Sequence, residues 1–208
     1  YFMILGAVTP KNKKDLRSSL HPNTIKPILD MGIDIIFESG LGEGMDVHDE
    51  VFLSLGVKSA SREACLSQSD VLMSTSPIAV NEISAMKDQA LFLGLMEPFS
   101  NKEQFSAFQL NNVSAVSMEF IPRITRAQKM DVLSSQSNLA GYVAVIESAK
   151  ELKSALPMMM TAAGTLKPAT VFVIGVGVAG LQAIATAKRL GAKVEAFDTR
   201  PIVEEQVK

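Results

Sequence analysis

A glycine-rich segment near the end of the sequence carries its clearest chemistry. It consists of Gly175, Val176, Gly177, Val178, Ala179 and Gly180, which is the G-x-G-x-x-G pattern. Gly175 permits a tight turn, Gly177 lets the backbone approach a pyrophosphate, and Gly180 lets the next helix lie close on its strand. The first N–H groups of that helix attract phosphates. The segment predicts a dinucleotide-binding turn.

A carboxylate follows this turn where the same motif needs one. Asp198 lies eighteen residues beyond Gly180, at the end of the next expected strand. It can accept hydrogen bonds from an adenosine ribose, and its charge repels the 2′-phosphate of NADP, so NAD(H) is the favoured ligand. Thr199 and Arg200 complete the predicted binding segment, although a guanidinium at Arg200 also suits that phosphate. A glycine turn that only packs is the structural alternative.

The segments around the turn have the pattern that positions it. Residues 170–174 are β-branched and apolar and predict a strand, a helix is expected through Leu190, and 193–198 predict a second strand. Residues 168–187 carry no charge, but their glycines favour a strand, turn and helix over a membrane span. The last residues, 201–208, are expected to enter a helix. We therefore expect 169–208 to be the incomplete start of a Rossmann domain, in a fragment that is inactive alone.

The first part of the chain predicts another α/β domain, over residues 3–121. Apolar segments of strand length alternate with segments of helical periodicity, which indicates βα units and a mostly parallel sheet. The expected strands are 2–8, 33–38, 71–73, 90–95 and 113–118, and the expected helices are 22–31, 48–55, 83–86 and 102–110.

Residues 122–168 are expected to connect the two domains. A polar, arginine-bearing stretch leads to a helix from Asp131, a good N-cap, to about Leu152, and its Leu139, Val143 and Ile146 can pack on either side. Gly141 inside this helix costs about 1 kcal/mol unless close packing requires it. Residues 155–168 are expected to be irregular, with methionines that fill gaps. The predicted fold is two Rossmann-like domains with mostly parallel sheets, joined by a long helix.

Composition excludes several classes of protein. The 208 residues are 47% hydrophobic and 20% charged, which is typical of globular proteins, and the net charge of −2 gives no general attraction to nucleic acid or anionic membrane. The single cysteine, Cys65, excludes an intramolecular disulfide and is expected in the core. His21 and His48 are expected to face solvent, and no metal site is expected. The opening lacks signal-peptide features, and Met3 is the expected native start.

Four segments together resemble the NAD(H)-binding alpha component of proton-translocating nicotinamide nucleotide transhydrogenase, in the alanine dehydrogenase/transhydrogenase superfamily. They are residues 122–128 (PRITRAQ), 131–142 (DVLSSQSNLAGY), 173–181 (VIGVGVAGL) and 196–201 (AFDTRP). The resemblance covers essentially the whole chain from Met3 and is most specific from Pro122 onward. It implies an NAD(P)⁺ transhydrogenase of the Si-specific/Re-specific type, with NAD(H) between two Rossmann-like domains.

The resemblance also implies a loop over the nicotinamide. Its functional residues fall at Arg123, Gln128, Asp131 and Ser134, all of which match the family's pattern, and the first three are the candidate catalytic residues. An amide and a hydroxyl can hold the carboxamide and the ribose, and an Arg–Asp pair can hold a polar loop against the cofactor. The alternative for Arg123 and Asp131 is a salt bridge and an N-cap without ligand contact.

Two other functions stay open. Alanine dehydrogenases are similar throughout, but their proton-transferring lysine and histidine fall at Met73 and Met96 here; Arg17 does match their carboxylate-binding arginine. Direct hydride transfer from NADH to NADP⁺ needs no general acid or base, so this loss fits transhydrogenation. The second alternative is an NAD-binding module that catalyses nothing by itself.

The family further implies partners and a location. One dinucleotide motif is present, so NADP(H) and the proton channel are expected on other components, one spanning the membrane and one binding NADP(H). A homodimer is expected at the cytoplasmic face of the bacterial inner membrane or the mitochondrial matrix side, held peripherally by its partners. Neither nucleic-acid binding nor direct membrane insertion is expected.

Overall fold

The computed structural model describes residues 3–201 and 203. The chain divides into two compact units, Tyr1–Met130 and Asp131–Lys208. Each unit is an α/β structure with a parallel sheet, as the sequence predicts. Most of the helix expected at 201–208 lies outside the described residues.

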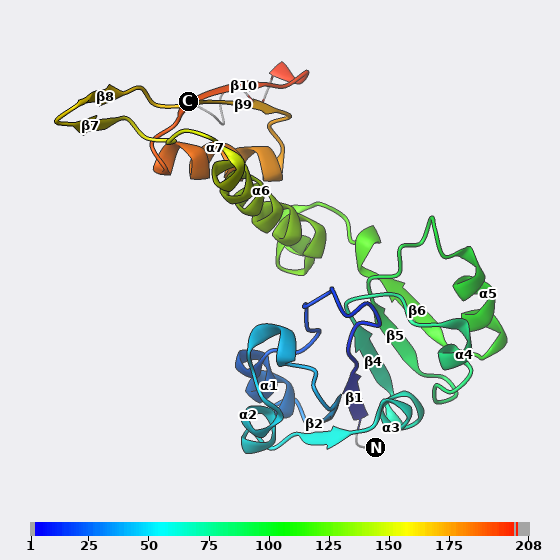
Figure 1. Ribbon diagram of the computed structural model, residues 1–208. Helices are drawn as coiled ribbons and strands as arrows, with labels where there is room; N and C mark the ends of the chain where they lie inside the picture. Colours follow the sequence, from blue (N-terminus) through cyan, green and yellow to red (C-terminus); the bar gives the residue numbers. More distant parts are fainter. Residues whose placement is uncertain (1–2, 202, 204–208) are drawn as a thin grey trace. The chain divides into compact units, whose positions relative to one another are not determined.

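The first unit is built on a six-stranded parallel sheet with the order β3-β2-β1-β4-β5-β6 (Figure 1). The strand order reverses between β1 and β4, as in doubly wound folds. The strands are β1 (Met3–Ala7), β2 (Ile33–Glu38), β3 (Lys58–Ala60), β4 (Val71–Ser74), β5 (Leu91–Gly94) and β6 (Ser114–Ser117).

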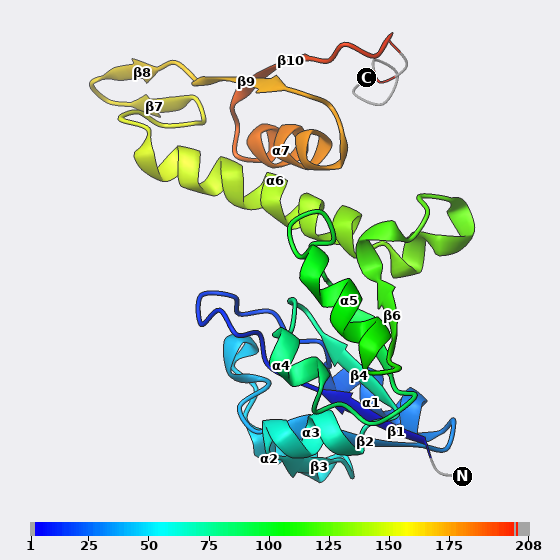
Figure 2. The same cartoon turned by 90° about the vertical axis from the view of Figure 1, so that its right-hand side faces the viewer.

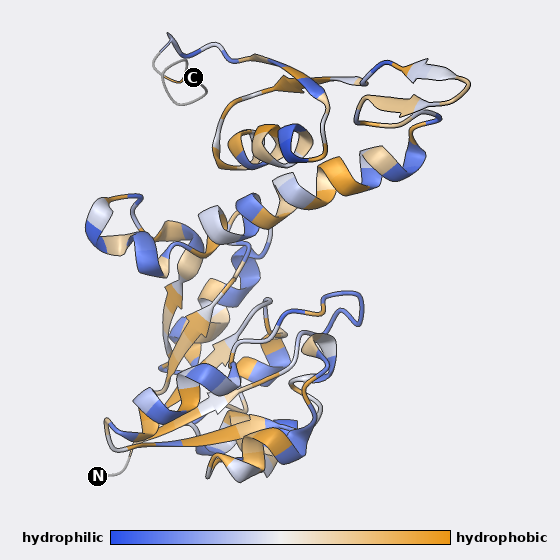
Figure 3. Cartoon of the chain, turned by 90° about the vertical axis from the view of Figure 1, so that its left-hand side faces the viewer, coloured by the Kyte–Doolittle hydropathy of each residue, from blue (hydrophilic) through white to orange (hydrophobic). Residues whose placement is uncertain are grey.

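Helices cover both faces of this sheet. They are α1 (Pro22–Leu29), α2 (Asp49–Ser54), α3 (Arg62–Gln68), α4 (Val80–Ile83) and α5 (Lys102–Leu110), with the 3-10 turns η1 (Glu43–Met45), η2 (Met118–Phe120) and η3 (Thr125–Met130). Successive strand residues point to opposite faces. Phe37 therefore joins Ile25 of α1 and Phe52 of α2, whereas Ile36 joins a second cluster with Phe108 of α5. Apolar colour accordingly follows the strands in Figure 3.

Two details of this unit correct the sequence expectations. The helix expected at 83–86 begins earlier, at Val80, because the Glu82 carboxylate accepts the Ala79 N–H at 2.7 Å and fixes the first turn there. Strand β3 and helix α3 were not expected at all. Their sequences are too short to show a clear period, although Ser61 caps α3 by accepting from the Ala64 N–H at 3.2 Å.

The second unit begins with the long helix α6 (Val132–Glu151). It continues with β7 (Met159–Thr161), β8 (Gly164–Leu166), β9 (Thr170–Ile174), α7 (Val178–Arg189) and β10 (Lys193–Phe197). β9 and β10 pair in parallel, and α7 connects them. The strand, turn and helix predicted over 168–187 are thus confirmed. The expected irregular segment at 155–168 instead contains an antiparallel hairpin, β7–β8.

Helix α6 packs against α7, and Figure 2 shows the two side by side. A Cβ added at Gly141 would lie 2.1 Å from the Ala179 carbonyl oxygen, so the glycine is required for this approach. Gly141 and Val145 are the buried residues of α6, whereas Leu139, Val143 and Ile146 are exposed, contrary to the expectation that those three pack. The alternative of close packing at the glycine is confirmed.

One face of the β9–β10 pair faces α7, and the other is open. Phe172 and Ile174 on β9 and Phe197 on β10 are 59%, 77% and 54% exposed. Within the described residues, no helix combines the length and apolar character that crossing a membrane requires.

Candidate functional site

The glycine turn lies between β9 and α7, where the sequence places it. Gly175 has φ +91°, which strains any other residue, and its N–H donates to the Phe197 carbonyl at 2.8 Å. A Cβ on Gly180 would lie 1.8 Å from the Gly175 carbonyl oxygen. These two glycines are therefore required by the fold itself.

Gly177 differs from both. It is the N-cap of α7 with φ −85° and ψ −164°, an extended conformation open to any residue. No protein atom lies within 4 Å of a Cβ added there. Nothing in the described fold thus explains a glycine at this position, whereas a ligand that approaches the backbone would explain it.

The start of α7 is suited to an anion. Its N-cap has no side-chain hydrogen bond, and its first turn has no acidic residue. The first N–H groups of a helix lack intrahelical partners and carry the positive end of its dipole. No carboxylate in the first turn competes for them, so they can bind a phosphate.

Asp198 follows β10 and reaches back to the turn. Its Oδ2 accepts the Val176 N–H at 2.7 Å, and its Oδ1 accepts the Arg200 N–H at 2.8 Å. The Arg200 side chain adds two hydrogen bonds, from Nε to Oδ1 at 3.0 Å and from Nη2 to Oδ2 at 3.1 Å. These side-chain bonds, then the two backbone bonds, hold the pKa of Asp198 well below its usual range. The carboxylate is ionised at neutral pH and fixed against the turn.

A cavity of about 320 Å³ opens beside this carboxylate. Three of its lining residues come from the predicted site, and four were not predicted. They are Val176, Asp198 and Arg200, with Ala196, Phe197, Pro201 and Val203. The added residues neighbour Asp198 in sequence, so proximity to the acidic residue was the one signal for them.

The predicted loop residues fall into both compact units. Arg123 precedes η3 and Gln128 lies within it; both are exposed, while Ala127 between them is buried. Asp131 caps α6, as predicted, because its Oδ1 accepts the Ser134 N–H at 2.9 Å and its Oδ2 accepts the Ser134 hydroxyl at 2.6 Å. The structure thus joins Asp131 with Ser134, and their contact with a ligand stays a prediction.

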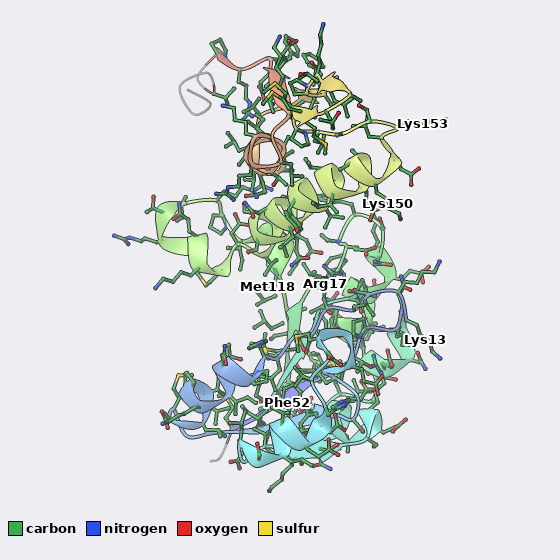
Figure 4. The ribbon with its side chains drawn as sticks, turned by 60° about the vertical axis from the view of Figure 1, so that its left-hand side comes forward. Lys13, Arg17, Phe52, Met118, Lys150 and Lys153 are labelled. Atoms are coloured by element: carbon green, nitrogen blue, oxygen red, sulfur yellow. The ribbon has the colours of Figure 1, made fainter. Side chains whose placement is uncertain are left out.

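The first unit has a larger cavity of its own. It has a volume of about 610 Å³ and lies past the carboxyl ends of β1 and β2, with Lys13 and Arg17, labelled in Figure 4, among its lining residues. Arg17 grips Asp15 through Nε to Oδ1 at 2.8 Å and Nη2 to Oδ2 at 2.7 Å, and also donates to the Thr75 carbonyl at 3.2 Å. Its guanidinium is therefore engaged within the protein.

The positions matched to the proton-transferring residues of alanine dehydrogenases lie in the core. Met96 is 1% exposed in the cluster around Phe92 and Phe108, and Met73 packs against the cluster around Phe37. Cys65 is fully buried, as predicted, and burial raises the pKa of its thiol to about 12. Among residues 3–201 and 203, no three His, Cys, Asp or Glu side chains are grouped to hold a metal ion.

Comparison with known proteins matches two family models in succession. Residues 8–140 match "Alanine dehydrogenase/PNT, N-terminal domain", and residues 144–208 match "Alanine dehydrogenase/PNT, C-terminal domain".

Curated relatives extend over nearly all of the chain. It is 45% identical over 206 residues to an NAD(P) transhydrogenase subunit alpha of Rhodospirillum rubrum, covering 95% of this chain and 54% of that protein. It is 40% identical over 210 residues to the protein of the same name from Rickettsia prowazekii, covering 99% and 55%. The chain thus spans about half the length of these relatives.

Two solved structures show the same fold. A transhydrogenase from Sinorhizobium meliloti superimposes with a TM-score of 0.94 at 43% identity, covering 98% of this chain and 61% of that one. An L-alanine dehydrogenase superimposes with a TM-score of 0.83 at 18% identity, covering 99% and 57%, a likeness of fold alone.

Proposed function

Since this chain belongs to the alanine dehydrogenase/PNT family, we propose that it is the NAD(H)-binding component of a proton-translocating NAD(P) transhydrogenase. In this role it positions NADH for direct hydride transfer to NADP⁺ bound on a partner component. The relatives at 40–45% identity are named as alpha subunits of such an enzyme, which favours this function within the family.

The single observation that carries the proposal is the empty surrounding of Gly177. Of the three motif glycines, it alone lacks a reason within the described fold, and it lies at the N-terminus of α7. A pyrophosphate at this place approaches the backbone to within the space that a Cβ would take. Asp198, held against the same turn by the Val176 N–H, is then positioned for the adenosine ribose.

Each part of the dinucleotide has proposed protein partners. The 175–180 turn and the start of α7 hold the pyrophosphate, and Asp198, with Thr199 and Arg200 beside it, meets the adenosine ribose. Gln128 and Ser134 hold the nicotinamide half, and Arg123 and Asp131 order their loop. NAD(H) supplies the hydride when bound, and the chain's residues supply orientation.

The reaction itself asks little chemistry of the protein. A hydride leaves C4 of NADH and adds to C4 of NADP⁺, which gives NAD⁺ and NADPH, and no proton is gained or lost at the reacting carbons. A general acid or base is not required. The methionines at 73 and 96, set in the apolar core, fit such a reaction.

The proposed assembly follows the family. We place the chain in a homodimer that associates with membrane-spanning and NADP(H)-binding components, at the cytoplasmic face of the bacterial inner membrane or the mitochondrial matrix side. The name "subunit alpha" of the relatives supports the need for partner subunits.

A second candidate is an alanine dehydrogenase-like oxidoreductase. Arg17 and the first-unit cavity favour it, because a guanidinium in a cavity suits a carboxylate substrate. Against it, the guanidinium already grips Asp15. An NAD-binding module without any catalytic role is the third candidate.

Three assays separate these functions. The proposal expects NADH to bind in preference to NADPH, and expects hydride exchange once an NADP(H)-loaded partner component is added. NADH binding without exchange beside a competent partner leaves the non-catalytic module. Formation of alanine from pyruvate, ammonium and NADH by this protein alone establishes the dehydrogenase.

A further inference from the structure

The ribose-binding carboxylate is already filled by the protein. Oδ1 of Asp198 accepts the Arg200 N–H and Nε, and Oδ2 accepts the Val176 N–H and the Arg200 Nη2, at distances from 2.7 to 3.1 Å. A carboxylate has about four acceptor positions, two on each oxygen. All of them are therefore occupied.

The four donors are of two kinds. The N–H groups of Val176 and Arg200 belong to the backbone of the glycine turn and of the segment after β10, so they stay where the fold puts them. The other two come from the Arg200 guanidinium. A ribose diol also brings two donors, its 2′- and 3′-hydroxyls, so it can replace the guanidinium one for one.

The guanidinium is also the group that is free to leave. The Arg200 side chain is 59% exposed, whereas the Asp198 side chain is 7% exposed. Exposed ion pairs contribute little net stability, because water solvates both charges when they part. Both side chains line the 320 Å³ cavity, so the departing side chain stays beside the ligand.

We propose that Arg200 occupies the ribose subsite as an internal substitute for the diol, and that NAD(H) binds by displacing its guanidinium from Asp198. This inference rests on the proposed function, since that function assigns Asp198 to the adenosine ribose.

Displacement gives Arg200 opposite effects on the two nucleotides. NAD(H) must compete with the guanidinium and gains no charge partner from it at the ribose. NADP(H) carries a 2′-phosphate there, which Asp198 repels but the released guanidinium attracts. Arg200 therefore weakens NAD(H) binding, strengthens NADP(H) binding and narrows the preference between them.

The test compares Arg200→Met with Arg189→Met, an exposed arginine at the far end of α7. Methionine keeps an unbranched stem and removes the donors. In Arg200→Met the NADH dissociation constant falls about two- to fivefold, the range set by loss of an exposed ion pair, and that for NADPH rises. Arg189→Met leaves both constants as in the wild type.

A second measurement needs no substitution. The ¹⁵Nε–¹H resonance of Arg200 in the wild type is followed while adenosine is added, with 2′-deoxyadenosine as the control that lacks one hydroxyl. Adenosine shifts the resonance toward that of a solvent-exposed arginine, and 2′-deoxyadenosine shifts it less.

The outcomes distinguish the inference from its premise. NADH affinity in Arg200→Met equal to or weaker than in the wild type, or an Arg200 resonance that bound adenosine leaves unmoved, overturns the displacement alone. Loss of NADH binding in the wild type and Arg200→Met alike overturns the proposed function, and the displacement with it.

Discussion

Each compact unit contains an Asp-x-Arg segment with the same local geometry. In Asp15-Leu16-Arg17 and in Asp198-Thr199-Arg200, the arginine N–H and Nε donate to Oδ1 and Nη2 donates to Oδ2. The two segments differ in which partner the rest of the fold holds. Arg17 also donates to the Thr75 carbonyl, whereas Asp198 also accepts the Val176 N–H.

This difference assigns different roles to the two segments. In the first unit the arginine is tied to the loop after β4, and the aspartate satisfies it. In the second unit the aspartate is tied to the glycine turn, and the arginine covers it. A ligand with hydroxyl donors can replace Arg200, but it has no equivalent place beside Arg17. The same short sequence can thus close a site or guard one, depending on a single further hydrogen bond.

The largest expected effect comes from removing the two aspartates in turn. Asp198→Ala weakens NADH binding about tenfold to a hundredfold, because a charged acceptor of two hydroxyls is lost, and it relaxes the preference over NADPH. Asp15→Ala, the matched control, leaves NADH affinity unchanged. Titration by calorimetry measures both. Unaltered discrimination in Asp198→Ala removes this residue from its role.

The next largest effect is steric. Gly177→Ala weakens NADH binding at least about fivefold by filling the space of the pyrophosphate, while the melting temperature stays that of the wild type, since its φ of −85° suits alanine. Gly180→Ala is the contrasting variant and loses more than about 1 kcal/mol of unfolding free energy. Wild-type NADH affinity in Gly177→Ala contradicts the assignment of this turn to the phosphates.

Gln128→Ala tests whether the first unit contributes the nicotinamide contacts. Hydride exchange with an NADP(H)-loaded partner slows about tenfold through loss of one orienting hydrogen bond, while the adenosine half remains bound. Stopped-flow absorbance follows the exchange, and adenosine binding gives the control. If the substitution abolishes all NADH binding, the division of contacts between the loop and the glycine turn is wrong.

The smallest expected effect concerns acid stability in the first unit. The Arg17 side-chain hydrogen bond is the main cause that lowers the pKa of Asp15. A carboxyl with a lowered folded pKa contributes stability above its unfolded pKa of about 3.9 and loses it as the pH falls through the folded value. Arg17→Met therefore loses less than about 1 kcal/mol at pH 6, since the pair is partly exposed, and less again at pH 3.

Urea unfolding at these two pH values measures the effect, and Arg189→Met serves as the control. An equal loss of stability at pH 6 and pH 3 contradicts an ionic contribution from the Asp15–Arg17 pair.

Much of the architecture could be predicted from the sequence. The strand, glycine turn, helix and second strand of the NAD-binding region follow from periodicity and glycine spacing, and Asp131 is the predicted N-cap of α6. The strands β3, β7 and β8 were missed because three residues cannot show an alternation. The exposed Leu139 shows that apolar spacing in α6 does not mark its packed face, which a glycine provides.

The site was predictable only in part. Motif spacing identifies Gly177 and Asp198, but it does not reveal that Gly177 alone lacks a structural reason, which depends on the atoms around each glycine. Nor does it show that Arg200 fills both oxygens of Asp198, since a side-chain conformation has no sequence signature. The residues that hold a ligand were found from type and spacing, and those that compete with it required coordinates.

The central claim is direct hydride transfer from NADH on this protein to NADP⁺ on its partner. The most direct test uses NADH deuterated at C4, mixed with the protein and an NADP⁺-loaded partner component, and mass spectrometry of the NADPH formed. The account predicts that the deuterium appears in NADPH, because no proton exchange with solvent occurs at the reacting carbons. NADPH that carries hydrogen from water instead would contradict it.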